Sequence, residues 1–325
     1  MASRWLLTSL FLSLCSTSYA QDYEPPLTEW GVPDFQAVWK HSSIIPFERP
    51  PELEDRRAYT DAEAGGLERV AQALFEEDAQ PLDPNRGAPQ ADRNLPPRFN
   101  YDHFWREDAT VLPTVNGELR TSAIIDPPNG RMPPRLPWID EFLAERERER
   151  NREDVNGLNN DGPEGRTLAE RCLVAFGPLA GPVMMPVIYN SHLQFIQSPG
   201  YVTIVAEMVH DARIIKITNQ RNPAAEHQQK WMGDSIGRWE GNTLVVETKN
   251  FNPWHRFQGF PVEQLTVTET FRLESPGKLI YGFTVVDPNV FTDTFSGEYP
   301  LTRSDVSIYE YACHEGNYAL EGILA

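Results

Sequence analysis

The sequence predicts a mainly β protein, in which an antiparallel up-and-down barrel makes up the C-terminal half and a proline-rich, irregular N-terminal wrap carries two helices. From residue 189 onward, short segments rich in Val, Ile, Thr, Tyr and Phe follow one another at a spacing of about 10–15 residues, without helical patterns between them. By contrast, 17 of the 28 prolines precede residue 140. Such a series of strands closes into a barrel or folds as a sandwich, and we favour a barrel that binds a small ligand.

The first twenty residues, MASRWLLTSLFLSLCSTSYA, have the layout of a cleaved signal peptide. One positive charge at Arg4 precedes an apolar run over Trp5–Leu14, and small residues end the segment at Ala20. The stretch before Cys15 faintly resembles a lipoprotein cleavage box, but Leu14 is too large for the position preceding the cysteine. We therefore expect export to the periplasm or the medium, with a lipid-anchored form as the less favoured alternative.

Residues 21–165 are predicted to form the wrap, because proline removes a backbone donor and fixes φ. One helix is expected near residues 61–77, with Thr60 as its N-cap. The other is expected near residues 138–153, where the charge run ERERER is typical of a solvated helix face. Residues 166–325 are assigned to the barrel, packed with the wrap as one globular unit.

Alternation along the predicted strands identifies titratable side chains on apolar faces. In the strand LTVTETFRL, Glu269 lies on the face of Val267 and Phe271. In YVTIVAEMVH, the same alternation places His210 on the apolar face of the strand. A buried charge costs several kcal/mol unless it is paired, so these residues are expected to find partners across the barrel interior.

The segment SIYEYACHEGNY near the C-terminus is predicted to be the last strand. If the strand persists, Glu310 and His314 share one face, and Tyr311 and Cys313 share the other. Once the signal peptide is removed, Cys172 and Cys313 are the only cysteines left in an oxidising compartment. We expect a disulfide bond between them.

The candidate catalytic groups are acids and histidines, since a histidine oriented by a carboxylate meets the requirement for proton transfer near neutral pH. Arg213 and Tyr311 are candidates for binding substrate and stabilising negative charge, and Trp239 and Trp254 are candidate aromatic contacts. For each of these residues a purely structural role is the competing interpretation. The catalytic candidates are His210, His314, Asp211, Glu269 and Glu310.

Several classes of function are disfavoured. The net charge of -18 repels nucleic acid and anionic lipid. No apolar run after the leader approaches the roughly 18 residues that span a bilayer. Neither CxxC, HxH, HExxH nor a phosphate-binding glycine motif is present, so we expect no metal and no cofactor. The segment GDSIG lacks the strand-to-helix context of a serine nucleophile.

Four segments are distinctive beyond their composition: ERCLVAFGP, SPGYVTIVAEMVHDARII, GDSIGRWEGNTLVVET and PLTRSDVSIYEYACHEGNY. Together with PDFQAVW near the start, they resemble a large family of exported bacterial proteins of unassigned function. This resemblance implies secretion and a shared polar site, and it assigns no catalytic residue. The strand section more loosely resembles lipocalin-like calycin barrels, some of which isomerise, hydrate or cyclise hydrophobic molecules.

These observations lead to a hypothesis of an exported barrel enzyme that acts on a small, largely apolar molecule by acid/base proton transfer, as a lyase, isomerase, cyclase or hydratase. The first alternative is a non-catalytic carrier of a hydrophobic ligand. The second is an envelope protein that docks a partner through its N-terminal wrap. A catalyst needs at least two titratable groups converging in a cavity, whereas a carrier needs an almost wholly apolar one.

Overall fold

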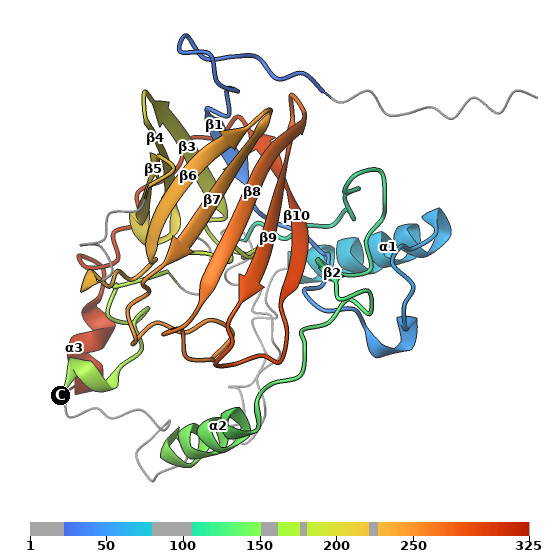
Figure 1. The fold of residues 1–325 in the computed structure, drawn as a ribbon. Coiled ribbons are helices and arrows are strands. Elements are labelled where there is room, and N and C mark those ends of the chain that lie inside the picture. The colour runs from blue at the N-terminus through green and yellow to red at the C-terminus, as the bar shows by residue number, and fades with distance from the viewer. Residues whose placement is uncertain (1–22, 80–105, 151–161, 176–180, 221–226, 325) are drawn as a thin grey trace, which may run out of the picture.

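A computed structural model describes residues 23–79, 106–150, 162–175, 181–220 and 227–324 of the chain (Figure 1). The predicted signal peptide lies outside these residues. The strands are β1 (Ala37–Lys40), β2 (Ile124–Asp126), β3 (His192–Ser198), β4 (Tyr201–Ala206), β5 (Ala212–Ile217), β6 (Asp234–Glu240), β7 (Thr243–Lys249), β8 (Thr266–Ser275), β9 (Lys278–Val286) and β10 (Phe295–Ser304). The helices are α1 (Asp61–Asp78), α2 (Pro137–Arg150) and α3 (Tyr318–Leu324), with short 3-10 turns η1 (Pro51–Leu53), η3 (Pro163–Gly165) and η4 (Met208–His210).

The strands form a closed barrel of nine, as the sequence predicted. Strands β3 to β10 pair in chain order, and β1 pairs with both β3 and β10 to close the ring. Strand β2 adds to β10 as a tenth member of the sheet. All pairings are antiparallel except the short contact between β5 and β6, which is parallel.

The closing strand β1 lies in the region that the sequence analysis assigned to the wrap. Val38 pairs with Gln194 on one side and with Ser304 on the other, so this strand is central and not peripheral. A four-residue strand preceded by prolines gives little local signal, because its pairing partners lie more than 150 residues away. The wrap and the barrel therefore share one sheet.

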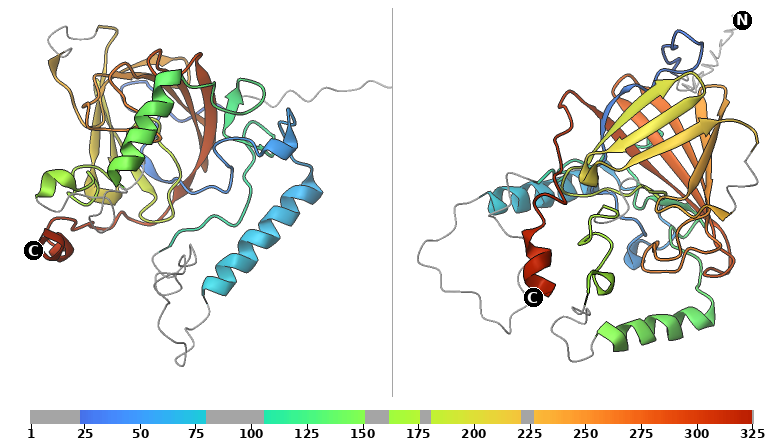
Figure 2. Two further views of the ribbon diagram at one scale, coloured as in Figure 1. Left: turned by 90° about the horizontal axis from the view of Figure 1, so that it is seen from below. Right: turned by 90° about the vertical axis from the view of Figure 1, so that its left-hand side faces the viewer.

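The two predicted helices are present. Helix α1 begins after Thr60, whose side chain caps the Glu63 amide while Glu63 caps the Thr60 amide in return. Helix α2 covers 137–150, and the predicted extension to residue 153 lies outside the described residues. Both helices lie outside the barrel wall (Figure 2). None of the described helices is long and apolar enough to cross a membrane.

The buried face of the barrel wall contains an ion pair. Glu269 is fully buried beside Phe271, as its place on the apolar face predicted, and both oxygens of its carboxylate meet the Arg213 guanidinium. The Tyr281 hydroxyl donates to Glu269 Oε1 at 3.1 Å and accepts from the Met184 amide at 2.9 Å. These hydrogen bonds compensate the two buried charges.

His41 directly follows β1 and is fully buried between the rings of Tyr281 and Tyr299. Its Nε2 donates to the Met184 carbonyl at 3.2 Å. Burial lowers the pKa of His41 to about 4, and the hydrogen bond offsets only part of this effect. The imidazole is therefore neutral at pH 7.

Replacing Glu269 with Gln is expected to destabilise the fold, because it leaves the Arg213 charge buried and unpaired. The expected loss is about 3–5 kcal/mol in the free energy of unfolding, measured by urea denaturation. The double variant Arg213→Met with Glu269→Leu is the control, since it removes both charges and should recover most of the loss. Equal stability of E269Q and the unaltered protein would contradict the buried pair.

Stability is expected to fall as the pH drops from 6.5 to 4, in part because of His41. The unfolded chain takes up a proton on this histidine near pH 6.5, whereas the folded protein resists it until about pH 4. The shift corresponds to roughly 3 kcal/mol over that window. The variant His41→Gln should show a correspondingly flatter pH dependence of its unfolding free energy, and the exposed His227→Gln should not.

Candidate functional site

A cluster of three titratable side chains forms where β3 begins and β4 ends. The β3–β4 hairpin turns at Pro199 and Gly200, and its register places Leu193 opposite Ala206. One step further along, the Glu207 amide donates to the His192 carbonyl at 2.9 Å. The hairpin thus brings the side chains of His192 and Glu207 together.

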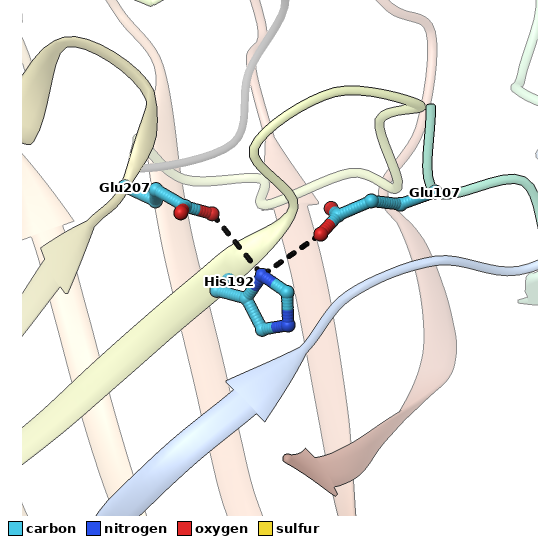
Figure 3. A group of neighbouring side chains, drawn as sticks. All are labelled: Glu107, His192 and Glu207. Carbon is cyan, nitrogen blue, oxygen red and sulfur yellow. Dashed lines mark hydrogen bonds and ion pairs between the residues drawn. The ribbon is translucent and has the colours of Figure 1, made fainter. Parts of the chain in front are cut away.

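The third member, Glu107, comes from the wrap and completes the cluster (Figure 3). His192 Nδ1 lies 3.0 Å from Glu107 Oε1 and 3.1 Å from Glu207 Oε2. The second oxygen of Glu107 accepts from the Ser191 amide at 2.7 Å, and that of Glu207 accepts from the Tyr309 amide at 2.8 Å. Each of the four carboxylate oxygens therefore has a partner that holds it in place.

Burial distinguishes the two carboxylates. The side chains of His192 and Glu207 are 5% and 1% exposed, whereas that of Glu107 is 21% exposed. The Ser191 hydroxyl is also buried, and it lies close enough to Glu107 to lower the pKa of that carboxyl. Glu107 is the member of the cluster that faces outward.

The pKa values of the side chains in the cluster depend on one another. A hydrogen bond to Glu107, and a second one with a smaller effect to Glu207, raise the pKa of His192 to about 9. Burial acts to raise the pKa of Glu107, but hydrogen bonds from His192 and Ser191 outweigh it and lower the pKa to about 2. At pH 7 His192 is an imidazolium held by carboxylates, and two carboxylates with one cation leave a formal charge of -1.

A cleft of about 1000 Å³ opens beside the cluster. Its walls come from the wrap, from the turn at 169–170, from the end of β4 and from the C-terminal segment with α3. The C-terminal segment contributes apolar and aromatic side chains to the lining, together with the carboxylate of Glu310. The lining includes Arg106, Glu107, Glu170, Asn190, Glu207, Tyr309, Glu310, Tyr311, Cys313, Asn317, Leu320 and Ile323.

Two of the predicted site residues, Glu310 and Tyr311, line this cleft, but they do not lie on a strand. The predicted last strand at SIYEYAC is wrong: the chain leaves the barrel after Ser304. The reason is that β10 already pairs with β9, β1 and β2, so no edge remains for another strand. His314 is exposed in a turn and does not line the cleft.

The expectation that His210 faces the barrel interior is also wrong. Strand β4 ends at Ala206, and Val209 and His210 adopt positive φ angles of 61° and 43° in the turn η4. This turn exposes His210 and leaves Asp211 half-buried. Burial raises the pKa of Asp211 to about 6, although its hydrogen bond with the Ala175 backbone opposes the shift.

The remaining predicted site residues lie away from the cleft. Arg213 and Glu269 pair with each other within the barrel, so neither is available to a ligand at the cluster. Trp239 packs edge-on against Phe35, with ring centroids 5.2 Å apart. Trp254 is 67% exposed and lines a different hollow.

The sequence analysis did not select Glu107 or His192. A signal for His192 exists, because the turn at Pro199-Gly200 fixes the hairpin register and counting back from it pairs residue 192 with residue 207. Glu107 has no comparable signal, since it belongs to a segment without regular structure.

The predicted disulfide bond between Cys172 and Cys313 is present. It joins two walls of the cleft: the turn that carries Glu170 and the C-terminal segment. A second link is the hydrogen bond of 2.7 Å from the Asn317 amide group to the Glu170 carbonyl. The disulfide bond thereby helps to fix Tyr309, whose amide donates to Glu207, relative to the barrel.

Comparison with known proteins found no matching family model and no curated protein or solved structure similar to this chain. The resemblance to a family of exported bacterial proteins stays a prediction. The function has to be argued from the geometry of the site itself.

Removing the disulfide with Cys172→Ala and Cys313→Ala is expected to lower the free energy of unfolding. The bond spans 141 residues of sequence, for which loop entropy gives roughly 3–5 kcal/mol. Urea denaturation would measure the loss, and limited proteolysis should cut the segment after Ser304 faster. Treating the unaltered protein with a reductant is the matched control, and unchanged stability in both experiments would contradict the prediction.

Proposed function

We propose that the protein is an enzyme whose active site is the cleft, and that Glu107, His192 and Glu207 hold a divalent cation there. The substrate class is a small, largely apolar molecule, and the chemistry is proton transfer of the lyase, isomerase, cyclase or hydratase type. The observation that carries the proposal is the convergence of three ligand atoms, all within 4.8 Å of one another, at the wall of a cleft.

The separations suit a metal ion in place of the proton on Nδ1. Metal–ligand bonds of about 2.0–2.2 Å put neighbouring ligand atoms roughly 3.0–3.5 Å apart. The two N···O distances in the cluster are 3.0 and 3.1 Å. One imidazole nitrogen with two carboxylate oxygens suits zinc, manganese or ferrous iron. Three protein ligands leave positions open for water or substrate, as catalytic sites require.

The surroundings are arranged as support for such a centre. The Tyr309 amide orients Glu207, and the Ser191 amide orients Glu107. Outer hydrogen bonds of this kind fix metal ligands in place. The buried Ser191 hydroxyl is a further polar group beside the proposed ion.

A bound divalent cation polarises a carbonyl oxygen or lowers the pKa of a bound water to near 7, which is the chemistry that hydration and enolisation need. Glu310 also lines the cleft and is the candidate for exchanging a proton with a bound molecule. Tyr311, Leu320 and Ile323 supply apolar surface for the substrate body.

The alternative of a hydrophobic carrier is less well supported. Aromatic side chains inside the barrel pack against one another: the rings of Phe195 and Phe271 are 5.5 Å apart, and those of Phe271 and Tyr281 are 5.3 Å apart. The Arg213–Glu269 pair adds two charges to that interior. A carrier needs an apolar cavity, whereas the cleft outside the barrel has several carboxylates on its walls.

We also propose that the protein is exported. A disulfide bond between its two remaining cysteines is typical of the periplasm or the extracellular medium.

Purified protein loaded with zinc, manganese or ferrous iron is expected to retain about one equivalent of metal after gel filtration, measured by mass spectrometry of the element. His192→Ala and Glu107→Gln should each lower metal affinity by about 10–100-fold or more, since a ligand or its charge is lost. Glu240→Gln, on an exposed hairpin where the carboxylate pairs with Arg238, is the matched control and should bind normally.

Incubating metal-loaded protein with a metabolite extract, followed by untargeted mass spectrometry, tests the enzyme itself. A small molecule should disappear with the unaltered protein, and turnover should fall by about 100-fold or more in H192A and after chelation. Turnover that survives chelation but needs Glu310 would reject the cation and retain acid/base chemistry. A compound that co-purifies without changing would favour the carrier.

A further inference from the structure

A second hollow, of about 770 Å³, lies on the other side of the turn at residues 164–171. Its lining comes from α2, this turn and the segment at 254–259, and it shares Ala169 with the cleft of the cation cluster. Four arginines and a single carboxylate, that of Glu164, contribute to its lining. The arginines are Arg146, Arg166, Arg171 and Arg256. Arg166 pairs with Glu170 at 2.6 Å, which leaves three arginines and Glu164 at this hollow. The local excess of positive charge contrasts with the net charge of -18 of the chain.

Two of these guanidinium groups share one aromatic ring. The central carbon of the Arg146 guanidinium is 5.9 Å from the ring centroid of Phe142, and that of Arg256 is 6.0 Å from it. Their hydrogen bonds go to backbone carbonyls: Arg146 donates to Gly259 at 3.1 Å, and Arg256 donates to Pro253 and His255. Neither forms an ion pair within the described part of the chain.

The positive charges of Arg146 and Arg256 repel each other. Burial lowers the pKa of Arg256, and the nearby charge of Arg146 lowers it further, while Glu263 acts in the opposite direction. A contrast is provided by Arg148 on the same helix, which pairs with Glu145. Arg146 and Arg256 thus lie near each other, and among the described residues neither has a carboxylate partner like the one that Glu145 provides for Arg148.

An oxyanion would complete this arrangement. The planar guanidinium group binds phosphate and carboxylate through paired N–H donors. Arg146 and Arg256 line the same hollow, so both can offer such donors to one anion. Trp254, which is 67% exposed, adds a flat apolar surface at the same hollow. His255 is neutral at pH 7, because burial lowers its pKa to about 4, so its ring adds neither charge nor repulsion.

We propose that this hollow binds a small organic anion, with Arg146 and Arg256 on its phosphate or carboxylate group and Trp254 against its apolar body. Arg171 has no ion pair among the described residues and provides a third positive charge at the same hollow. The site stands apart from the proposed cation centre, and neither depends on the other.

Isothermal titration calorimetry with inorganic phosphate, phenyl phosphate and benzoate tests the site. The unaltered protein should bind at least one oxyanion saturably at a 1:1 ratio, and the apparent affinity should fall as chloride is raised. Arg146→Gln and Arg256→Gln should each weaken binding tenfold or more. Arg148→Gln removes the same charge from the same helix and should bind like the unaltered protein.

The contact of Trp254 with the apolar body of the ligand is tested separately. Trp254→Ala should weaken phenyl phosphate several-fold and leave inorganic phosphate unchanged. Circular dichroism verifies that each variant is folded, and an anion-dependent rise of the melting temperature in the unaltered protein gives a second readout. Absence of saturable binding by all three anions up to about 10 mM, or equal binding by R146Q, R256Q and R148Q, would overturn the proposal.

Discussion

The insertion of β1 between β3 and β10 is the constraint on which the rest of the structure depends. Without it, a sheet of eight consecutive strands would keep two open edges, each with unpaired backbone donors and acceptors. The same short strand also positions the site. Directly after it, the His41 amide donates to the Ser191 carbonyl at 2.9 Å, and the Ser42 hydroxyl donates to the Glu107 carbonyl at 2.6 Å. Barrel closure therefore holds two of the cluster's segments side by side.

The parts of the fold that could be predicted are those with a local signal. Alternation placed Glu269 on the buried face, the N-cap placed α1, and cysteine counting gave the disulfide bond. What could not be predicted depends on partners far away in sequence. Strand β1 is defined by residues near 194 and 304, and the C-terminal segment is excluded from the sheet because β10 is already fully paired. The turn that exposes His210 has positive φ at two non-glycine residues, which no alternation pattern indicates.

The candidate site shows the same division. His192 and Glu207 are related by a hairpin register that the sequence contains, and Glu310 and Tyr311 are predicted from the sequence as catalytic and binding candidates. Glu107 joins them only through closure of the barrel and the path of the wrap. A histidine between two carboxylates is thus a product of tertiary structure, and scattered histidines in a sequence do not argue against a metal site.

Charge compensation differs between the barrel interior and the two hollows outside it. Within the barrel, Arg213 and Glu269 neutralise each other, and His41 is neutral. Outside it, charges stay unbalanced among the described residues: the cluster at the cleft has a formal charge of -1, and Arg146 and Arg256 at the hollow beside α2 form no ion pair there. An unbalanced charge on a rigid support lowers stability, and a ligand of opposite sign would offset that cost, which is the common basis of the two proposed sites. Both hollows border the turn that the disulfide bond fixes to the C-terminal segment, so one covalent link supports the walls of both.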